Sequence, residues 1–94
     1  MRFEWDPGKD EINLAKHGVS FEVATRVFDD PRHLSVKDRH VSGEERWQTL
    51  GLVGGMVVLL VAHTYREDDD DEVIRIISAR KATTHERQIY EHSY

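Results

Sequence analysis

The chain has 94 residues, of which 38% are hydrophobic, and its 13 Lys and Arg against 18 Asp and Glu give a net charge of −5. This length excludes two domains and predicts a single domain over residues 1–94, with a thin core that a partner or second copy would stabilise. The sequence has no cysteine, which excludes disulfides and thiol chemistry, and its longest apolar run, residues 56–62, is too short to span a bilayer. We therefore expect a cytoplasmic protein that makes no membrane contact.

The N-terminal third predicts one short strand and two helices. Aromatic residues at alternate positions favour a strand over residues 2–5. Asp6 followed by proline is typical of a helix start and Gly18 of a helix end, so we expect a helix over residues 7–17. Ser20 is a favourable N-cap for a second helix, which would bury the apolar stripe Phe21, Ala24, Val27 and Phe28.

The remainder of the chain predicts strands. The hydrophobic period changes to two at Leu34, which indicates a strand there. Residues 46–53 and 56–65 are expected to form a hairpin around Gly54-Gly55, because glycine adopts the positive φ of tight turns. The second of these strands is apolar on both faces and should lie in the middle of a sheet.

An uninterrupted acidic run over residues 67–72 is expected to be a solvated loop, because like charges repel and offer no apolar group to bury. A strand over residues 73–80 follows, and Thr83 with Glu86 predicts a capping box that opens a short C-terminal helix. Strands and helices occur in blocks, which predicts an α+β fold in the order β-α-α-β-β-β-β-α. We expect a mostly antiparallel sheet with the two N-terminal helices packed on one face.

The first helix carries a stripe of polar and cationic side chains at helical spacing. Ile12 and Ala15 are expected to point elsewhere, toward the core. The stripe is either a solvated helix surface or a cationic track for the phosphates of RNA. Its members are Lys9, Asn13, Lys16 and His17.

Arginines near strand ends form the second group of candidates. Arg66 and Arg80 suit phosphate binding, because a guanidinium binds phosphate through two donors and keeps its charge. Arg75 lies in the middle of a strand, where it either forms a structural ion pair or contacts RNA. We expect Lys16, Arg66 and Arg80 to converge on one anion despite the negative net charge.

Other side chains could transfer protons or stack on bases. His17 or His40 could act as a general acid or base near neutral pH, and Glu45 could deprotonate a ribose hydroxyl. Trp5 and Tyr90 could stack on bases, although aromatic residues in a small domain are often core. The six histidines show no two-ligand metal signature, so we expect neither a metal site nor a cofactor.

Taken together, these motifs resemble the BrnT family of bacterial toxins over nearly the whole chain. The resemblance implies a RelE-like fold and a ribonuclease that inhibits translation as the toxin of a type II toxin–antitoxin system. It further implies a DNA-binding antitoxin, BrnA, that masks the toxin and is alone in contacting operator DNA. The toxin is expected either as a dimer or in an assembly of two toxin and two antitoxin chains. The motifs that carry it are Phe3-Glu4-Trp5-Asp6, Lys16-His17-Gly18-Val19-Ser20-Phe21, Glu44-Glu45-Arg46-Trp47 and Arg75-Ile76-Ile77-Ser78-Ala79-Arg80.

The leading hypothesis from the sequence is metal-independent RNA cleavage by attack of a ribose 2′-hydroxyl on the adjacent phosphate. The family pattern maps onto Lys16, His17, Arg66 and Arg80. In this hypothesis the arginines hold the scissile phosphate, Lys9 and Lys16 steer the backbone, and His17 or Glu45 assists proton transfer with Tyr90 as a partner. The alternative is a non-catalytic RelE-like module that binds a basic partner through its acidic run and acts in transcriptional control.

Overall fold

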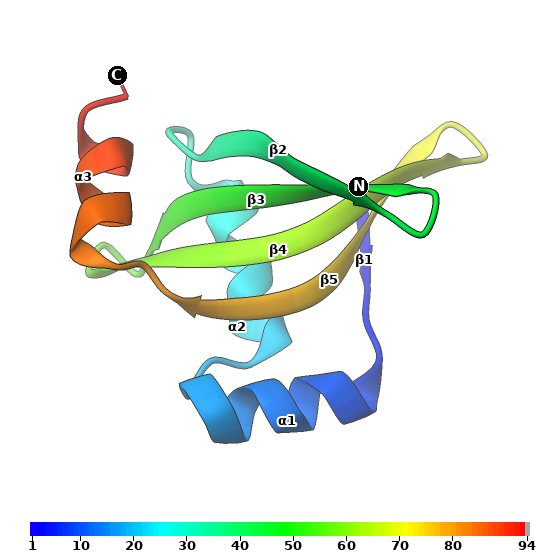
Figure 1. Cartoon of the computed structure of the whole chain (residues 1–94), viewed down its shortest axis with the longest axis horizontal. Helices are drawn as coiled ribbons and strands as arrows, with labels where there is room; N and C mark the ends of the chain where they lie inside the picture. Colours follow the sequence, from blue (N-terminus) through cyan, green and yellow to red (C-terminus); the bar gives the residue numbers. More distant parts are fainter. Residues whose placement is uncertain (94) are drawn as a thin grey trace.

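The computed structural model describes residues 1–93, apart from the side chain of Val41, as a five-stranded sheet with helices on one face, one edge and one end (Figure 1). The strands lie in the order β1-β5-β4-β3-β2, with β1 parallel to β5 and the other pairs antiparallel. The predicted α+β fold with a mostly antiparallel sheet is therefore confirmed. The elements are β1 (Arg2–Glu4), α1 (Pro7–His17), α2 (Phe21–Ala24), the 3-10 helix η1 (Thr25–Asp29), β2 (Leu34–Val41), β3 (Glu44–Val53), β4 (Val57–Asp68), β5 (Asp71–Lys81) and α3 (Thr84–Glu91).

Local capping groups define both ends of α1, as predicted. The side chain of Asp6 accepts a hydrogen bond of 2.8 Å from the backbone N–H of Gly8. Gly18 has a φ of 71° and its N–H donates to the carbonyl of Leu14 at 2.9 Å. Both groups satisfy backbone atoms that a helix end leaves unpaired, so these two residues determine the helix length.

The second predicted helix is instead one α-helical turn, α2, that continues as η1. Ser20 caps it by accepting from the N–H of Val23 at 3.1 Å. Phe21, Ala24 and Val27 are spaced by three residues and are all buried, and a 3-10 helix brings that spacing onto one face. A Cβ added at Gly51 would lie 2.6 Å from the Cβ of Val27, so η1 packs directly on the backbone of β3.

The prediction of a loop over the acidic run is wrong. β4 continues to Asp68 and β5 begins at Asp71, with Asp69 and Asp70 forming the turn at φ values of 51° and 66°. Two positive φ values in succession are typical of a tight hairpin turn, which aspartate tolerates better than most residues. Ion pairs with the N-terminus offset part of the repulsion, since the terminal amine contacts Asp71 at 2.7 Å and Arg2 contacts Asp68 at 3.0 Å.

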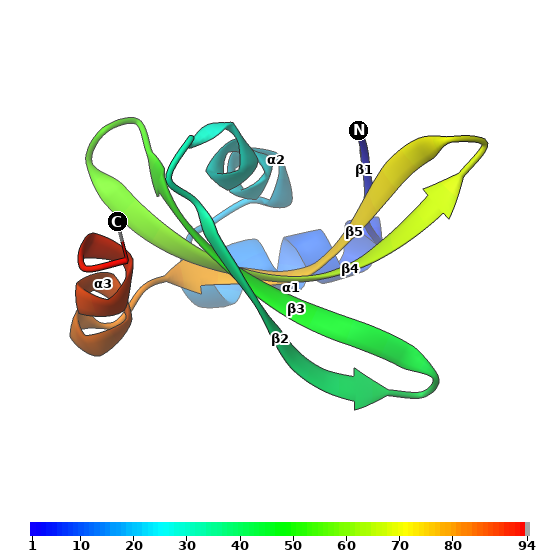
Figure 2. The same cartoon turned by 90° about the horizontal axis from the view of Figure 1, so that it is seen from above.

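The two N-terminal helices do not share one face of the sheet. Figure 2 shows α2 above the sheet, whereas α1 lies along the edge of β5 beyond the end of the short strand β1. The expected orientation of α1 is also wrong, because Ile12 is 68% exposed and Ala15 is exposed, while Asn13 is only 6% exposed.

Asn13 takes the place of a neighbouring strand at this edge. Its Nδ2 donates to the carbonyls of Ala79 at 2.8 Å and Val19 at 2.9 Å, and its Oδ1 accepts from the N–H of Ala79 at 3.2 Å. A buried sheet edge needs such partners because unpaired backbone groups are costly away from water. The polar residue is therefore the one that α1 buries against the sheet.

The sheet has an apolar layer on each of its two faces, the helical face and the open face. The helical face carries the main core, which α2 and η1 cover, and it includes Phe21, Leu59, Val61, Ile74 and Ile76. The opposite face, called the open face below, has a smaller cluster at one end, where α3 covers it. Figure 1 is seen from the open face, with α2 behind the strands and α3 at one end.

A buried histidine makes the stability of the fold depend on pH. His63 is fully buried on the helical face, where its Nε2 shares a 2.7 Å hydrogen bond with the hydroxyl of Thr49. Burial lowers the pKa of His63 from 6.5 to about 4. The unfolded chain therefore binds the proton first, and this contribution to stability is complete above pH 6.5 and is lost as the pH falls toward 4.

We expect the wild-type chain to lose about 3 kcal/mol of unfolding free energy from this histidine between pH 6.5 and pH 4. The variant His63→Gln, which can still contact Thr49, should lack that part of the slope. Urea denaturation of both proteins across this pH range measures the difference. Parallel pH profiles for the two proteins would contradict the neutral state of His63.

Candidate nucleic-acid interface

The register of β4 and β5 brings three arginines onto the open face. In β4, alternate residues share a face, so Leu60, Thr64 and Arg66 point the same way. Leu60 pairs with Arg80 and Thr64 pairs with Arg75, and paired residues lie on the same face. Arg66, Arg75 and Arg80 therefore form a row on the side of the sheet opposite α2.

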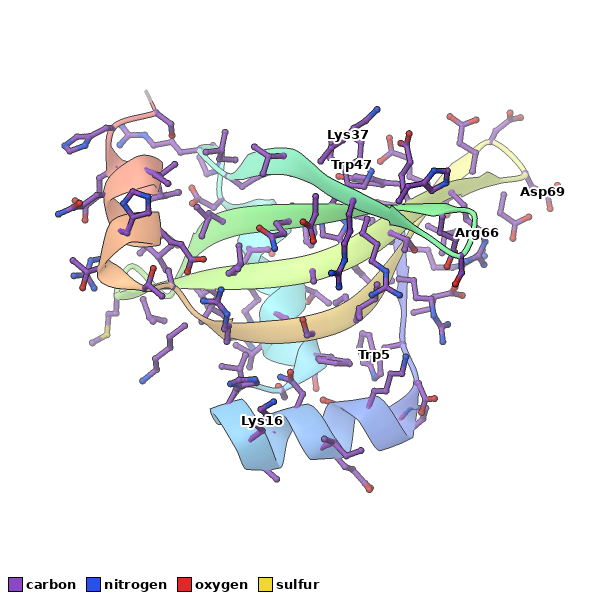
Figure 3. The ribbon with its side chains drawn as sticks, in the orientation of Figure 1. Trp5, Lys16, Lys37, Trp47, Arg66 and Asp69 are labelled. Carbon is purple, nitrogen blue, oxygen red and sulfur yellow. The ribbon has the colours of Figure 1, made fainter. Side chains whose placement is uncertain are left out.

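This row extends along the sheet and is not one cradle. Arg66 and Leu60, the partner of Arg80, are separated by about 20 Å along an extended strand. Figure 3 shows Lys16 on α1 and Arg66 near the β4–β5 hairpin, on well-separated parts of the molecule. The expected convergence of Lys16, Arg66 and Arg80 on one anion is therefore wrong.

Small side chains occupy the middle of the open face. Ala62 pairs with the exposed Ser78, and the pairing then shifts so that His63 pairs with Ile76. Ile77 is thus an extra residue in β5, a β-bulge of the kind that is over-represented beside active sites. Ser78 lies between the positions of Arg75 and Arg80 on this face.

Glu4 connects two arginines at the β1 end of the row. Arg66 donates to both carboxylate oxygens of Glu4, the second bond measuring 3.1 Å, and Nη1 of Arg75 lies 3.7 Å from the same carboxylate. The hydrogen bond from Arg66 lowers the pKa of Glu4. Two guanidinium groups therefore already converge on one anionic group here, and both remain partly exposed.

Arg80 is held at the other end of the row by Glu86. Its Nη1 and Nη2 donate to the two carboxylate oxygens at 2.7 and 2.9 Å. Glu86 also closes the predicted capping box of α3, accepting from the N–H of Thr83 at 2.8 Å. The hydrogen bond from Arg80 lowers the pKa of Glu86 to about 2, against the opposing effect of burial, so the pair is ionised at neutral pH.

The candidate residues of α1 lie together in a groove between this helix and β5. The groove has a volume of about 210 Å³. Ser78 belongs both to the groove and to the open face, and so connects the two surfaces. Its lining residues are Lys9, Ile12, Asn13, Lys16, His17, Ile77 and Ser78.

Three other candidates belong neither to the row of arginines nor to the α1 groove, and one of them, Tyr90, lies in the cluster that α3 covers. Glu45 contacts Lys37 at 3.4 Å on the helical face, one position away from residues that point to the open face. The buried Tyr90 donates its hydroxyl to Asp30, which also accepts from the N–H of Leu52 at 2.8 Å. Trp5 packs edge-on against Phe21, with ring centroids 6.3 Å apart.

Sequence reasoning missed the contacts of Glu4 and the positions of Ser78 and Arg46 on the open face. Glu4 contacts Arg66, which lies 62 residues away along the chain, and no local sequence pattern indicates such a contact. The position of Arg46 could have been predicted, because residues alternate between the two faces along a strand. Arg46 therefore lies on the face opposite to Glu45 and Trp47, which is the open face. Ser78 becomes notable only through the bulge beside it.

Within residues 1–93, no group of three or more His, Asp or Glu side chains is arranged to hold a metal ion. No helix in that part of the chain has the length and apolar character needed to cross a bilayer.

Comparisons with known proteins place the chain in a family. Residues 5–86 match the family model described as "Ribonuclease toxin, BrnT, of type II toxin-antitoxin system". Among solved structures, the ribonuclease toxin BrnT of Brucella abortus is similar in fold, with a TM-score of 0.64 and 22% sequence identity over 89% of this chain and 99% of that one. A search of curated proteins found no match. Because the family match covers most of the sequence, the chain belongs to the BrnT family of ribonuclease toxins from type II toxin–antitoxin systems.

Proposed function

We propose that the chain is a metal-independent endoribonuclease that binds the RNA backbone along the open face and cleaves it beside Ser78. The observation that carries this proposal is the register that aligns Arg66, Arg75 and Arg80 on a face that α3 covers at one end only. Several guanidinium groups along one face suit the repeated phosphates of a single strand. The RelE-like character of the fold belongs to the same proposal.

Arg80 acts on the scissile phosphate in this proposal. The ribose 2′-oxygen loses its proton and attacks the adjacent phosphorus, while the bond to the 5′-oxygen breaks and that oxygen gains a proton. The products are a 2′,3′-cyclic phosphate and a 5′-hydroxyl. A fixed guanidinium stabilises the charge that builds up on the phosphate oxygens in the transition state. Arg66 and Arg75 hold phosphates farther along the strand.

The α1 groove supplies proton transfer and further backbone contacts. His17 is half-buried in this groove, in the same lining as Lys16 and Ser78, and an imidazole can both accept and donate a proton. Lys9 and Lys16 attract the RNA backbone from the same helix. We assign proton transfer to His17. Glu45 faces the other side of the sheet, and the hydroxyl of Tyr90 already donates its hydrogen bond to Asp30.

A BrnA-like, DNA-binding antitoxin neutralises the toxin in this proposal. The two proteins assemble as two copies of each in the cytoplasm, and only the antitoxin contacts operator DNA. The acidic hairpin tip over residues 67–72 offers carboxylates to a basic segment of that partner.

Purified protein incubated with end-labelled RNA tests the proposed chemistry. Because arginines supply the positive charge, we expect cleavage to continue at an unchanged rate in EDTA, with cyclic phosphate at the new 3′ ends. Loss of cleavage in EDTA that magnesium restores would contradict the metal-independent mechanism. Products ending in a 3′-hydroxyl would contradict attack by the 2′-oxygen.

A non-catalytic interaction module is the second candidate, favoured by the ion pairs of Arg66 with Glu4 and Arg80 with Glu86. These carboxylates already neutralise two of the three arginines in the row. Expression of the chain alone in bacteria separates the two candidates. A ribonuclease should arrest growth, and its antitoxin should restore it, whereas a module of this kind should leave growth unchanged.

A further inference from the structure

Arg46 lies on the open face, beside the row of arginines already described. Lys37 lies over the ring of Trp47 at 5.6 Å (Figure 3) and contacts Glu45 at 3.4 Å. Glu45 and Trp47 of β3 therefore share the helical face. Arg46, between them in the strand, therefore points to the opposite side. The distance between Arg46 and the arginines of β5 follows from the strand pairing of β3, β4 and β5.

The pair Trp47 and His63 ends the β3–β4 ladder, so Arg46 and Thr64 are the next residues on the two strands. Thr64 pairs in turn with Arg75 in β5. Arg46 and Arg75 consequently face each other across β4, about two strand spacings or 10 Å apart. A line from Arg75 to Arg46 crosses the strands, whereas the row of Arg66, Arg75 and Arg80 follows them.

Arg46 differs from the other open-face arginines in having no carboxylate. Its Nε is buried and has no hydrogen-bond partner within the described chain, where Arg66, Arg75 and Arg80 each have an acidic partner. Buried polar groups in native structures are nearly always satisfied, and one that is not commonly marks the position of a water or a ligand. A guanidinium that no carboxylate of the described residues neutralises keeps its charge available for an anion.

A pocket of about 160 Å³ adjoins Arg46 near the turn of the β2–β3 hairpin, and side chains from both faces of the sheet line it. A register shift in β2 opens it, because Lys37 pairs with Trp47 and the next pair joins His40 to Glu45. Three cationic and two acidic side chains line the pocket together with His40, and Lys37 already neutralises one of the acids, Glu45. Its lining residues are Lys37, Asp38, Arg39, His40, Glu45 and Arg46.

We infer that Arg46 binds a backbone phosphate of the RNA on the open face, one position beyond the phosphate held by Arg75. The inference rests on the proposed ribonuclease function and adds a direction to it. The RNA turns from the β5 row and leaves the sheet across β4 and β3 toward the β2–β3 hairpin. Arg46 is a binding residue in this arrangement and takes no part in bond cleavage.

The test measures binding and cleavage separately. Binding uses a fluorescent 2′-O-methyl oligoribonucleotide, which cannot be cleaved because its 2′-oxygen is blocked, at several salt concentrations. Arg46→Ala should weaken binding by about tenfold and reduce the slope of log affinity against log salt by about 0.7, the value for one lost phosphate contact on a single strand. Arg46→Lys, which keeps the charge and the apolar stem, should retain most of the slope.

Arg26→Ala is the matched control, because Arg26 is an exposed arginine in η1 on the helical side of the sheet. If folded Arg46→Ala binds RNA as tightly as Arg26→Ala does at every salt concentration, the inference about Arg46 is overturned. Cleavage of ordinary RNA by the wild-type protein would still support the ribonuclease proposal in that case. If Arg46→Ala weakens binding but the wild-type protein cuts no RNA, the phosphate site stands and the ribonuclease proposal fails. Absence of both binding and cleavage in the wild type overturns both.

Discussion

Arg80→Ala is expected to lower the rate of RNA cleavage by about 100- to 1,000-fold while the protein remains folded. This is the range observed when one fixed donor to transition-state charge is removed. Glu86 keeps its hydrogen bonds with Thr83, so α3 retains its capping box in the variant. Single-turnover cleavage of a labelled oligoribonucleotide, with circular dichroism to verify folding, measures the effect.

Glu86→Gln provides the control for the structural role of the same ion pair. It removes the negative charge from the Arg80–Glu86 contact, whose bonds measure 2.7 and 2.9 Å, but leaves the guanidinium in place. We expect this variant to cleave RNA within about threefold of the wild type, because a neutral amide can still accept one hydrogen bond from Arg80. Equal losses of activity in both variants would mean that Arg80 serves only to hold α3.

Asn13→Ala is expected to lower the free energy of unfolding by about 3–5 kcal/mol. The substitution leaves three buried backbone groups without partners, namely the N–H and carbonyl of Ala79 and the carbonyl of Val19. Each unsatisfied buried group costs about 1–3 kcal/mol, and some are regained through water. Urea denaturation measures the loss.

Ile12→Ala is the matched control in the same helix turn. Ile12 is 68% exposed, so its truncation should change the unfolding free energy by about 0.5 kcal/mol or less. A hydrophobic helix face packed on the sheet would give the opposite ranking. If Ile12→Ala proves more destabilising than Asn13→Ala, the edge position of α1 is wrong.

Features with local causes could be predicted from the sequence. Asp6 and Gly18 act on backbone groups within four residues of themselves, and the bounds of α1 were predicted correctly. Thr83 and Glu86 form their capping box through the same kind of short-range contact. Gly54 and Gly55 adopt positive φ values as expected, although Met56 also belongs to the turn and β4 begins at Val57.

Features that depend on distant parts of the chain could not be predicted in this way. The burial of Asn13 requires knowing that β1 ends early and leaves an open edge at Ala79, 66 residues along the chain. The acidic hairpin forms because the strands β4 and β5 continue into it and the N-terminus supplies opposite charge. The prediction of a loop rested on charge repulsion alone. It neglected the continuation of the two strands and the opposite charge nearby.

The candidate site also combines features that have local causes with features that depend on distant parts of the chain. The types of residue that suit phosphate binding were evident from the sequence, since a guanidinium binds phosphate through two donors. Their arrangement followed from strand register, which separates Glu45 from Arg46 by face and places Lys16 in a groove of its own. A one-residue difference in register reverses every side chain of a strand, so single-sequence reasoning cannot establish such a site.

Binding of RNA to the open face can be measured residue by residue by NMR. Titration of the isotope-labelled protein with a 2′-O-methyl oligoribonucleotide should shift the backbone amide signals of Ala62, Thr64 and Ser78, which lie between the arginines. The signals of Ala24, Thr25 and Arg26 on the helical side should stay unchanged. Shifts confined to the helical side, with the open-face signals unmoved, would contradict the assignment of this face as the RNA site.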